Sequence, residues 1–185
     1  MSFHEYCHGY VADKMGDPTP RQNGRLTLNP IAHIDPIGFL TLLIFKFGWA
    51  KPVPINPYYF KDKRKGVFLV SLAGPLSNVF LAMITRILMS LFSGFHLIED
   101  FLTLLYIYNM FFAIFNLIPI PPLDGSKILW SFLPPKQAYI FSQYEQYGFV
   151  ILLLLLVTGF FGIILYPLYN GFDSIISAIL KPFGV

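Results

Sequence analysis

The chain has 185 residues, enough for one domain, and 55% of them are hydrophobic and 18% aromatic. Only 12% are charged, about half the share found in soluble domains, which excludes that class and indicates a membrane protein. The net charge of +3 is too small to suggest a nucleic-acid partner, and a single cysteine, Cys7, excludes an internal disulfide.

The first element is the stretch HEYCH, residues 4–8. On a helix His4 and His8 project from one face and can bind one zinc ion, with Glu5 close enough to act on water at the metal. The alternative is a helix with two incidental histidines, although ionisable groups in membrane segments are costly and usually functional. Because a spanning helix needs about 20 residues, we expect the given sequence to lack the front of this helix.

A polar stretch, GDPTPRQNGRLTLNP, follows. Its pair Asn23-Gly24 beside residues 25–28 predicts a tight turn leading into a strand, and so a short β-hairpin near the active site. The strand edge would either receive an unwinding substrate or cover the site. The next apolar segment, Pro36 to Trp49, is short and contains Lys46, which favours a re-entrant element.

Three later segments are long and apolar enough to cross a bilayer. They are Gly66 to Gly94, Phe101 to Ile118, and Phe149 to about Leu168. Apolar residues at helical spacing predict an amphipathic helix from Gly171 to Val185. The predicted fold is an all-α polytopic membrane protein with about four membrane helices, divided into a core, residues 1–170, and this C-terminal helix.

Basic residues predict the orientation of these helices. The run Lys61 to Lys65 contains four of them, and Lys14, Arg21 and Arg25 follow the opening motif. Because basic loops face the cytoplasm, we expect the opening motif and the end of the Phe101 helix on that side.

A catalytic zinc ion usually has three protein ligands. Suitable side chains further along the chain are His33, His96, Glu99, Asp100 and Asp124. The predicted topology places His96, Glu99 and Asp100 on the outer side, and Asp124 level with the two histidines. The prolines of NLIPIPPLDG, residues 116–125, break the helix before Asp124, and irregular backbone at this depth is typical of a site wall. A loop aspartate at the membrane surface is the alternative.

Three motifs in this order, HEYCH, GPLSN and NLIPIPPLDG, resemble those of the site-2 protease family of intramembrane zinc metalloproteases. HIDPIGFL and FGWAKPVP resemble its small bacterial branch without a PDZ domain. The resemblance, from about Phe3 to Trp130, implies His4, His8 and Asp124 as zinc ligands and Glu5 as general base. It also places Asn116 near the site, where its amide would hold the substrate backbone or the oxyanion, and aligns Asn78 with the polar position of GPxxN.

Two polar residues keep two interpretations each. Asn78 lies on a small-residue face with Gly74 and Ser77, so helix packing or a hydrogen bond between helices competes with substrate contact. His33 is either a group supporting the metal site or a loop histidine bonded to backbone, and the second interpretation is favoured.

The function that these residues predict is zinc-dependent endopeptidase activity on the transmembrane segments of other membrane proteins. The predicted setting is the lipid bilayer of the bacterial cell (inner) membrane, with a transmembrane protein as substrate. One alternative is a catalytically inactive or truncated relative that binds membrane segments without cutting them. Another, less favoured, is a metal transporter using His4, His8 and Asp124.

Overall fold

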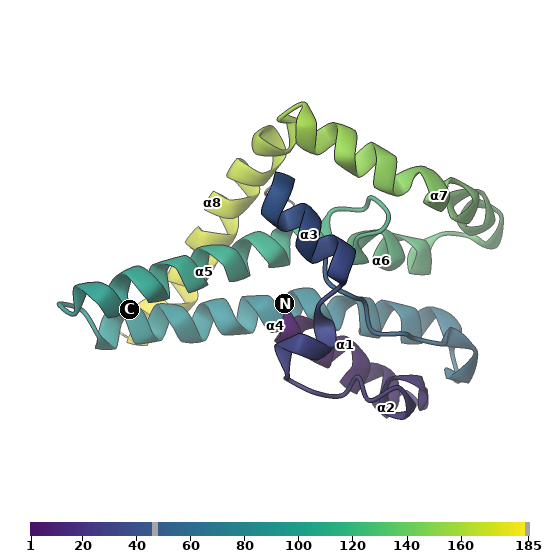
Figure 1. The fold of residues 1–185 in the computed structure, drawn as a ribbon, viewed down its shortest axis with the longest axis horizontal. Coiled ribbons are helices and arrows are strands. Elements are labelled where there is room, and N and C mark those ends of the chain that lie inside the picture. The colour runs from purple at the N-terminus through teal and green to yellow at the C-terminus, as the bar shows by residue number, and fades with distance from the viewer. Residues whose placement is uncertain (46–47, 184–185) are drawn as a thin grey trace. The chain divides into compact units, whose positions relative to one another are not determined.

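The computed structural model describes the whole chain except residues 46, 47, 184 and 185. The first two lie within the predicted re-entrant element and the last two at the end of the predicted C-terminal helix, so these parts of the predictions fall outside the described residues. The chain forms two compact units, Met1–Gly74 and Pro75–Val185. Helix α4, Lys63–Leu91, begins in the first unit and continues into the second (Figure 1).

The first unit consists of short elements before the start of α4. They are α1 (Ser2–Lys14), α2 (Thr19–Gln22), the 3₁₀ helix η1 (Pro30–His33), α3 (Pro36–Phe45) and the 3₁₀ helix η2 (Pro57–Tyr59). A small core of Ala12, Phe60 and Val70 joins α1 to the start of α4. This core holds the face of α1 that carries the HEYCH motif.

The predicted β-hairpin is wrong, because the described residues contain no strand and only one isolated bridge, between Ile34 and Ala50. Asn23-Gly24 instead ends α2: Gly24 has a φ of +63°, and the N–H groups of Gly24 and Arg25 donate to the carbonyls of Arg21 and Pro20. This is a helix C-cap. An Asn-Gly pair is typical both of a hairpin turn and of a glycine cap at the end of a helix, which explains the error.

Helix α3 has ten residues and is therefore about 15 Å long, half the thickness of a bilayer core. Many of its large apolar side chains are exposed, among them Ile37, Leu40 and Leu43. The helix is too short for a full span, as the sequence predicts.

The second unit contains the rest of α4 and four further helices. They are α5 (His96–Leu117), α6 (Asp124–Phe132), α7 (Pro135–Val157) and α8 (Phe160–Leu180), followed by the 3₁₀ helix η3 (Lys181–Phe183). One core cluster joins α4, α5 and α8 through Ala82, Met110 and Ile176. A second cluster joins the end of α5 to α7 and α8 through Ile118, Leu152 and Phe161.

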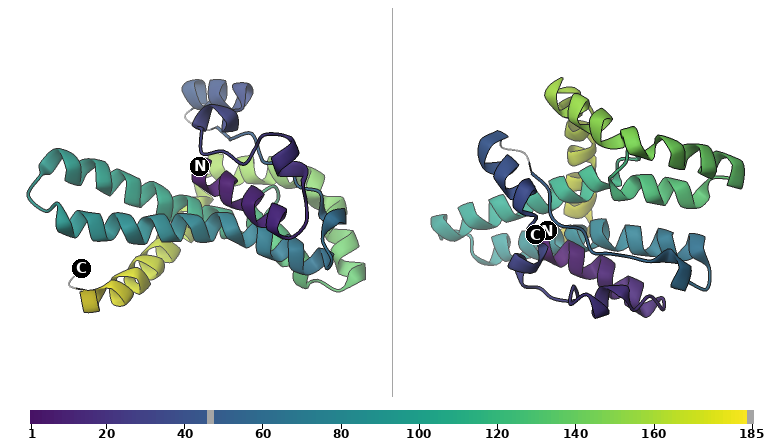
Figure 2. Two further views of the ribbon diagram at one scale, coloured as in Figure 1. Left: turned by 90° about the horizontal axis from the view of Figure 1, so that it is seen from below. Right: turned by 45° about the vertical axis from the view of Figure 1, so that its right-hand side comes forward.

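Among the described residues, four helices are long and apolar enough to cross a membrane: α4, α5, α7 and most of α8. The chain is therefore a multi-pass membrane protein, and its first two spans match the predicted segments. The predicted third span, Phe149 to Leu168, is divided instead at Gly159, whose φ of +72° ends α7 and begins α8 (Figures 1 and 2). The helix predicted from Gly171 is accordingly the second half of α8.

Candidate metal centre

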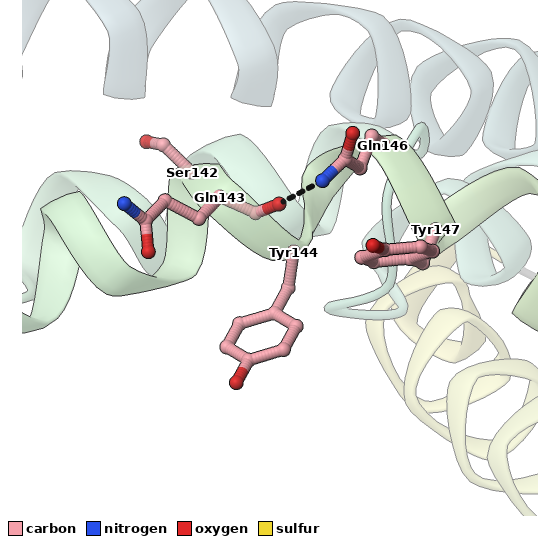
Figure 3. Close-up of a pocket in the computed structure, with 5 residues that line it drawn as sticks. All are labelled: Ser142, Gln143, Tyr144, Gln146 and Tyr147. Atoms are coloured by element: carbon pink, nitrogen blue, oxygen red, sulfur yellow. Dashed lines mark hydrogen bonds between the residues drawn. The ribbon is translucent and has the colours of Figure 1, made fainter.

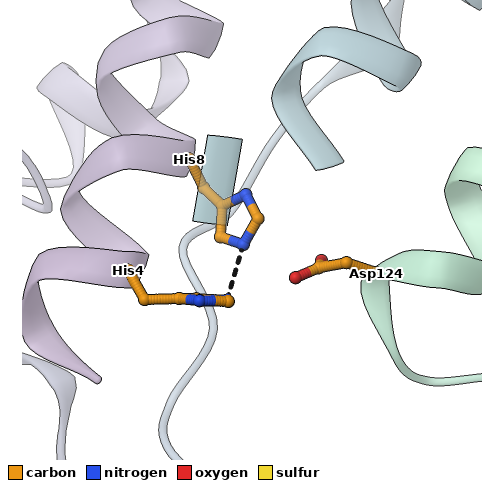
Figure 4. Close-up of side chains that lie close together, drawn as sticks. All are labelled: His4, His8 and Asp124. Atoms are coloured by element: carbon orange, nitrogen blue, oxygen red, sulfur yellow. Dashed lines mark hydrogen bonds between the residues drawn. The ribbon is translucent and has the colours of Figure 1, made fainter. Parts of the chain in front are cut away.

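The motif HEYCH lies on α1, where its two histidines occupy consecutive turns of one face (Figure 4). Both imidazoles are buried. Their rings meet edge to face with centroids 4.6 Å apart, and their Nε2 atoms are 2.9 Å apart. Two imidazole nitrogens directed at one point are a typical pair of zinc ligands.

A backbone group fixes the orientation of the second imidazole. Nδ1 of His8 donates a hydrogen bond to the Val70 carbonyl oxygen of α4 at 2.7 Å. Because a carbonyl only accepts, Nδ1 carries a proton, so in the neutral imidazole the lone pair is on Nε2. Histidine ligands of metal sites are usually oriented in this way, through the nitrogen that does not bind the metal.

Gly74 leaves the space beside both nitrogens open. A Cβ atom at this position of α4 would overlap Nε2 of His8 and would come within 2.6 Å of Nε2 of His4. Any other residue at position 74 would therefore fill the place to which the two histidines point. The donor atoms and the space reserved in front of them fit a zinc ion.

Glu5, between the two histidines in the sequence, is also buried. Its Oε2 accepts a hydrogen bond of 3.0 Å from the backbone N–H of Val53. A carboxylate held next to a candidate zinc-binding histidine is the arrangement that a general base requires.

Asp124 is the first residue of α6, in the second unit, and is buried (Figure 4). A carboxylate in the first turn of a helix is favoured by the partial positive charge of the helix N-terminus. The next residue, Gly125, packs so closely on the end of α5 that a Cβ atom would overlap the Leu117 carbonyl. The DG pair therefore fixes the start of α6, and with it the carboxylate, against α5.

The two predicted asparagines are both engaged within the second unit. Asn116, in the last turn of α5, donates from Nδ2 to the Phe112 carbonyl at 3.0 Å. Asn78 of α4 is 1% exposed and donates from Nδ2 to Oδ1 of Asn109 on α5 at 2.9 Å. The interpretation of Asn78 as a link between helices is confirmed, and substrate contact by either residue stays a prediction.

The alternative third ligands have other surroundings. Nε2 of His33 donates to the Thr27 carbonyl at 2.8 Å, which confirms the interpretation of a loop histidine bonded to backbone. The side chain of His96 is 93% exposed and lies 3.7 Å from Glu99. Asp100 is exposed as well.

Three residues that contribute to the candidate centre were not among the site residues predicted from the sequence. Val53 and Val70 act through their backbone N–H and carbonyl groups, so their side chains carry no signal. Gly74 belongs to the GPLSN motif but was interpreted only as a packing residue. Its position beside the imidazoles follows from the packing of α1 on α4, which the sequence pattern does not reveal.

A shallow hollow of about 530 Å³ lies elsewhere, on α7 (Figure 3). Its lining consists of Ser142, Gln143, Tyr144, Gln146 and Tyr147. These groups include neither a typical zinc ligand nor a carboxylate base, so the hollow does not compete with α1 as a catalytic centre.

Comparison with known proteins places residues 92–159 in Peptidase family M50. The chain is 41% identical over 195 residues to YwhC of Bacillus subtilis, described as a candidate zinc metalloprotease, and the match covers 98% of the chain and 89% of YwhC. It is 30% identical to Rip2 of Mycolicibacterium smegmatis, of the same description, covering 85% of the chain and 63% of Rip2. Rip2 of Mycobacterium tuberculosis is 31% identical, over 89% of the chain and 68% of Rip2. No solved structure matches the chain.

Proposed function

The chain belongs to peptidase family M50, the site-2 protease family of zinc metalloproteases, and from this premise we propose that it cuts peptide bonds within transmembrane segments of other membrane proteins. The observation that carries the proposal is the buried His4–His8 pair on α1, in a chain whose described residues include four helices apolar enough to cross a membrane. A metal centre in such surroundings suits a substrate that is itself in the bilayer. The relatives in Bacillus subtilis and mycobacteria support a bacterial cell membrane as its location.

We propose His4, His8 and Asp124 as the zinc ligands. Two neutral imidazoles and one carboxylate are an established ligand set for catalytic zinc and leave one position for water or substrate. All three side chains are buried, and Gly74 keeps the space beside both imidazoles open. Zinc in this place would polarise the scissile carbonyl and lower the pKa of water to about 7.

Glu5 would perform the proton transfers. Its carboxylate takes a proton from the attacking water as the carbon–oxygen bond forms, and returns it to the amide nitrogen as the carbon–nitrogen bond breaks. The N–H of Val53 holds one carboxylate oxygen, which leaves the second oxygen for the proton. The amide of Asn116 is our candidate for holding the substrate backbone or the developing oxyanion, by exchanging its bond to Phe112 for one to substrate.

The test is cleavage of a single-span membrane protein by the purified chain in lipid vesicles, compared with Glu5→Gln. We expect Glu5→Gln to retain about one zinc per chain and to lose at least about 1000-fold in kcat, and we expect a zinc chelator to abolish cleavage by the unmodified chain. Glu145→Gln is the matched control, because Glu145 is an exposed glutamate of α7. Equal cleavage by the Glu5→Gln variant would refute the proposal.

The alternative, a silent relative that binds membrane segments, gives a different result in the same experiment. Such a chain would retain the membrane substrate without cleaving it, whether or not zinc is bound. The described residues of the first unit give it no support, because Glu5, His4 and His8 are all present and buried in hydrogen-bonded positions.

A further inference from the structure

The stretch Lys51 to Ile55, KPVPI, has few backbone donors. Pro52 and Pro54 have no N–H, so within residues 51–54 only Lys51 and Val53 can donate. The Lys51 N–H donates to the His33 carbonyl at 2.9 Å, and the Val53 N–H donates to Oε2 of Glu5 at 3.0 Å. The two donors therefore tie this stretch to η1 on one side and to the proposed general base on the other.

The same stretch is tied a second time, by a buried cation. Nη2 of Arg25 donates to the Lys51 carbonyl at 2.6 Å and lies 3.3 Å from Nδ1 of His33. Because a guanidinium only donates, Nδ1 of His33 accepts from Arg25, while Nε2 of His33 donates to the Thr27 carbonyl. His33 thus orients the guanidinium toward the Lys51 carbonyl.

The burial of the Arg25 guanidinium is difficult to explain by stability alone. Arg25 is only 7% exposed, and among the described residues no carboxylate forms an ion pair with it. Its Nε is buried without a hydrogen-bond acceptor in the described part of the chain. Burying a charge with incomplete hydrogen bonding costs free energy, and each such group in a native protein calls for an explanation, of which a catalytic role is one.

Gly9 allows the stretch to reach α1. It lies four residues after Glu5 and therefore on the same helical face. A Cβ atom at position 9 would come within 2.9 Å of Leu26 and 3.3 Å of the Val53 side chain. The glycine lets the backbone of Val53 pass close to α1, where its N–H meets the Glu5 carboxylate.

We propose that Arg25, oriented by His33, is a positioning residue for Glu5. By holding the Lys51 carbonyl it fixes the Pro52-Val53-Pro54 backbone, so that the Val53 N–H holds one oxygen of Glu5 and the other oxygen accepts the proton of the attacking water. The inference rests on the proposed proteolytic function and adds that catalysis depends on a buried cation which touches neither substrate nor metal. All the contacts that carry it lie within the first unit.

The experiment compares Arg25→Ala with the unmodified chain in lipid vesicles. We expect kcat to fall about 10-fold to 100-fold, the loss typical of a catalytic group displaced by about 1 Å, with KM within about twofold and zinc content unchanged. Added methylguanidinium should restore part of kcat in Arg25→Ala, but none in Glu5→Gln. The matched control is Arg21→Ala, which removes an exposed arginine of the same unit and should leave kcat unchanged.

Hydrogen exchange gives a readout that is independent of activity. Within residues 51–54 only Lys51 and Val53 have a backbone N–H that can exchange. Both should exchange faster in Arg25→Ala, because the carbonyl that anchors them is released. Unchanged exchange together with unchanged kcat would overturn the proposal. The proposed function would survive that result if Glu5→Gln remained inactive.

Should Arg25→Ala fail to fold or to bind zinc, the pair Val53→Pro and Val53→Ala decides. Proline removes the N–H that Glu5 accepts, whereas alanine keeps it. A zinc-loaded Val53→Pro with at least about tenfold lower kcat than Val53→Ala supports positioning through this amide. Equal kcat values in the two variants would overturn it.

Discussion

The two units of the chain hold their buried polar side chains in different ways. In the first unit three of these side chains are held by backbone groups: the Val70 carbonyl for His8, the Val53 N–H for Glu5 and the Lys51 carbonyl for Arg25. In the second unit, two hydrogen bonds between side chains join neighbouring helices. Asn78 of α4 bonds to Asn109 of α5, and Tyr106 of α5 bonds to Asp173 of α8 at 2.6 Å.

A backbone partner orients a side chain, whereas a side-chain partner on another helix packs the two helices together. A backbone partner occupies one atom of a side chain and leaves another atom for chemistry, as Nδ1 and Nε2 of His8 illustrate. A pair of side chains joins two helices and satisfies both groups within the membrane, where an unpaired polar group is costly. We therefore expect substitutions in the first unit to affect zinc and catalysis, and those in the second to affect mainly stability.

The largest effect expected in the first unit belongs to Gly74→Ala. The added methyl group would occupy the space at Nε2 of both histidines, so we expect zinc affinity to fall at least about 100-fold. Metal content measured against free zinc concentration tests this. Gly94→Ala is the matched control: Gly94 has a φ of +96° and nothing near its Cβ position, so some stability would be lost but zinc affinity kept. Normal affinity in Gly74→Ala would contradict our description of the centre.

Asp124→Ala tests the one exception to the division between the units, because we propose this residue of the second unit as a zinc ligand. We expect zinc affinity to fall by about 100-fold or less, since two histidine ligands would remain. Asp173→Ala, which removes a half-buried carboxylate acceptor in the same unit, should leave zinc affinity unchanged. An Asp124→Ala variant that binds zinc normally would exclude Asp124 as a zinc ligand.

The sequence identified candidate residues for the centre, whose role as zinc ligands stays a prediction, and it predicted the elements around them only in part. His4 and His8 could be found because a helix brings positions four apart together, and Asp124 because prolines mark the end of α5. Val53, Val70 and Arg25 could not be assigned, because two of them act through backbone atoms and the third through a loop whose course depends on tertiary contacts. Composition predicted a multi-pass helical protein. It could not predict that α7 and α8 are separate helices, because their separation depends on one residue, Gly159, whose positive φ hydropathy does not reveal.

Asp173→Ala should give the largest loss of stability in the second unit. Tyr106 would lose the acceptor of its hydroxyl group, which at a buried position costs about 1–3 kcal/mol. Unfolding in mixed detergent measures the change, with Ser174→Ala as the control, because the hydroxyl of Ser174 bonds only within its own helix, to Asn170. Loss of cleavage per zinc-loaded molecule, with stability kept, would show that this pair does more than join α5 to α8.

The smallest effect that we expect is the coupling between Asn78 and Asn109. A double-mutant cycle with Asn78→Ala and Asn109→Ala isolates this bond, and hydrogen bonds between membrane helices average about 0.6 kcal/mol in such cycles. Asn109 also donates to the Leu105 carbonyl of its own helix, a bond that Asn78→Ala preserves. A coupling of this size with unchanged KM would assign Asn78 to packing. A KM raised by Asn78→Ala but not by Asn109→Ala would instead place Asn78 at the substrate, because only a direct contact would distinguish the two partners of one hydrogen bond.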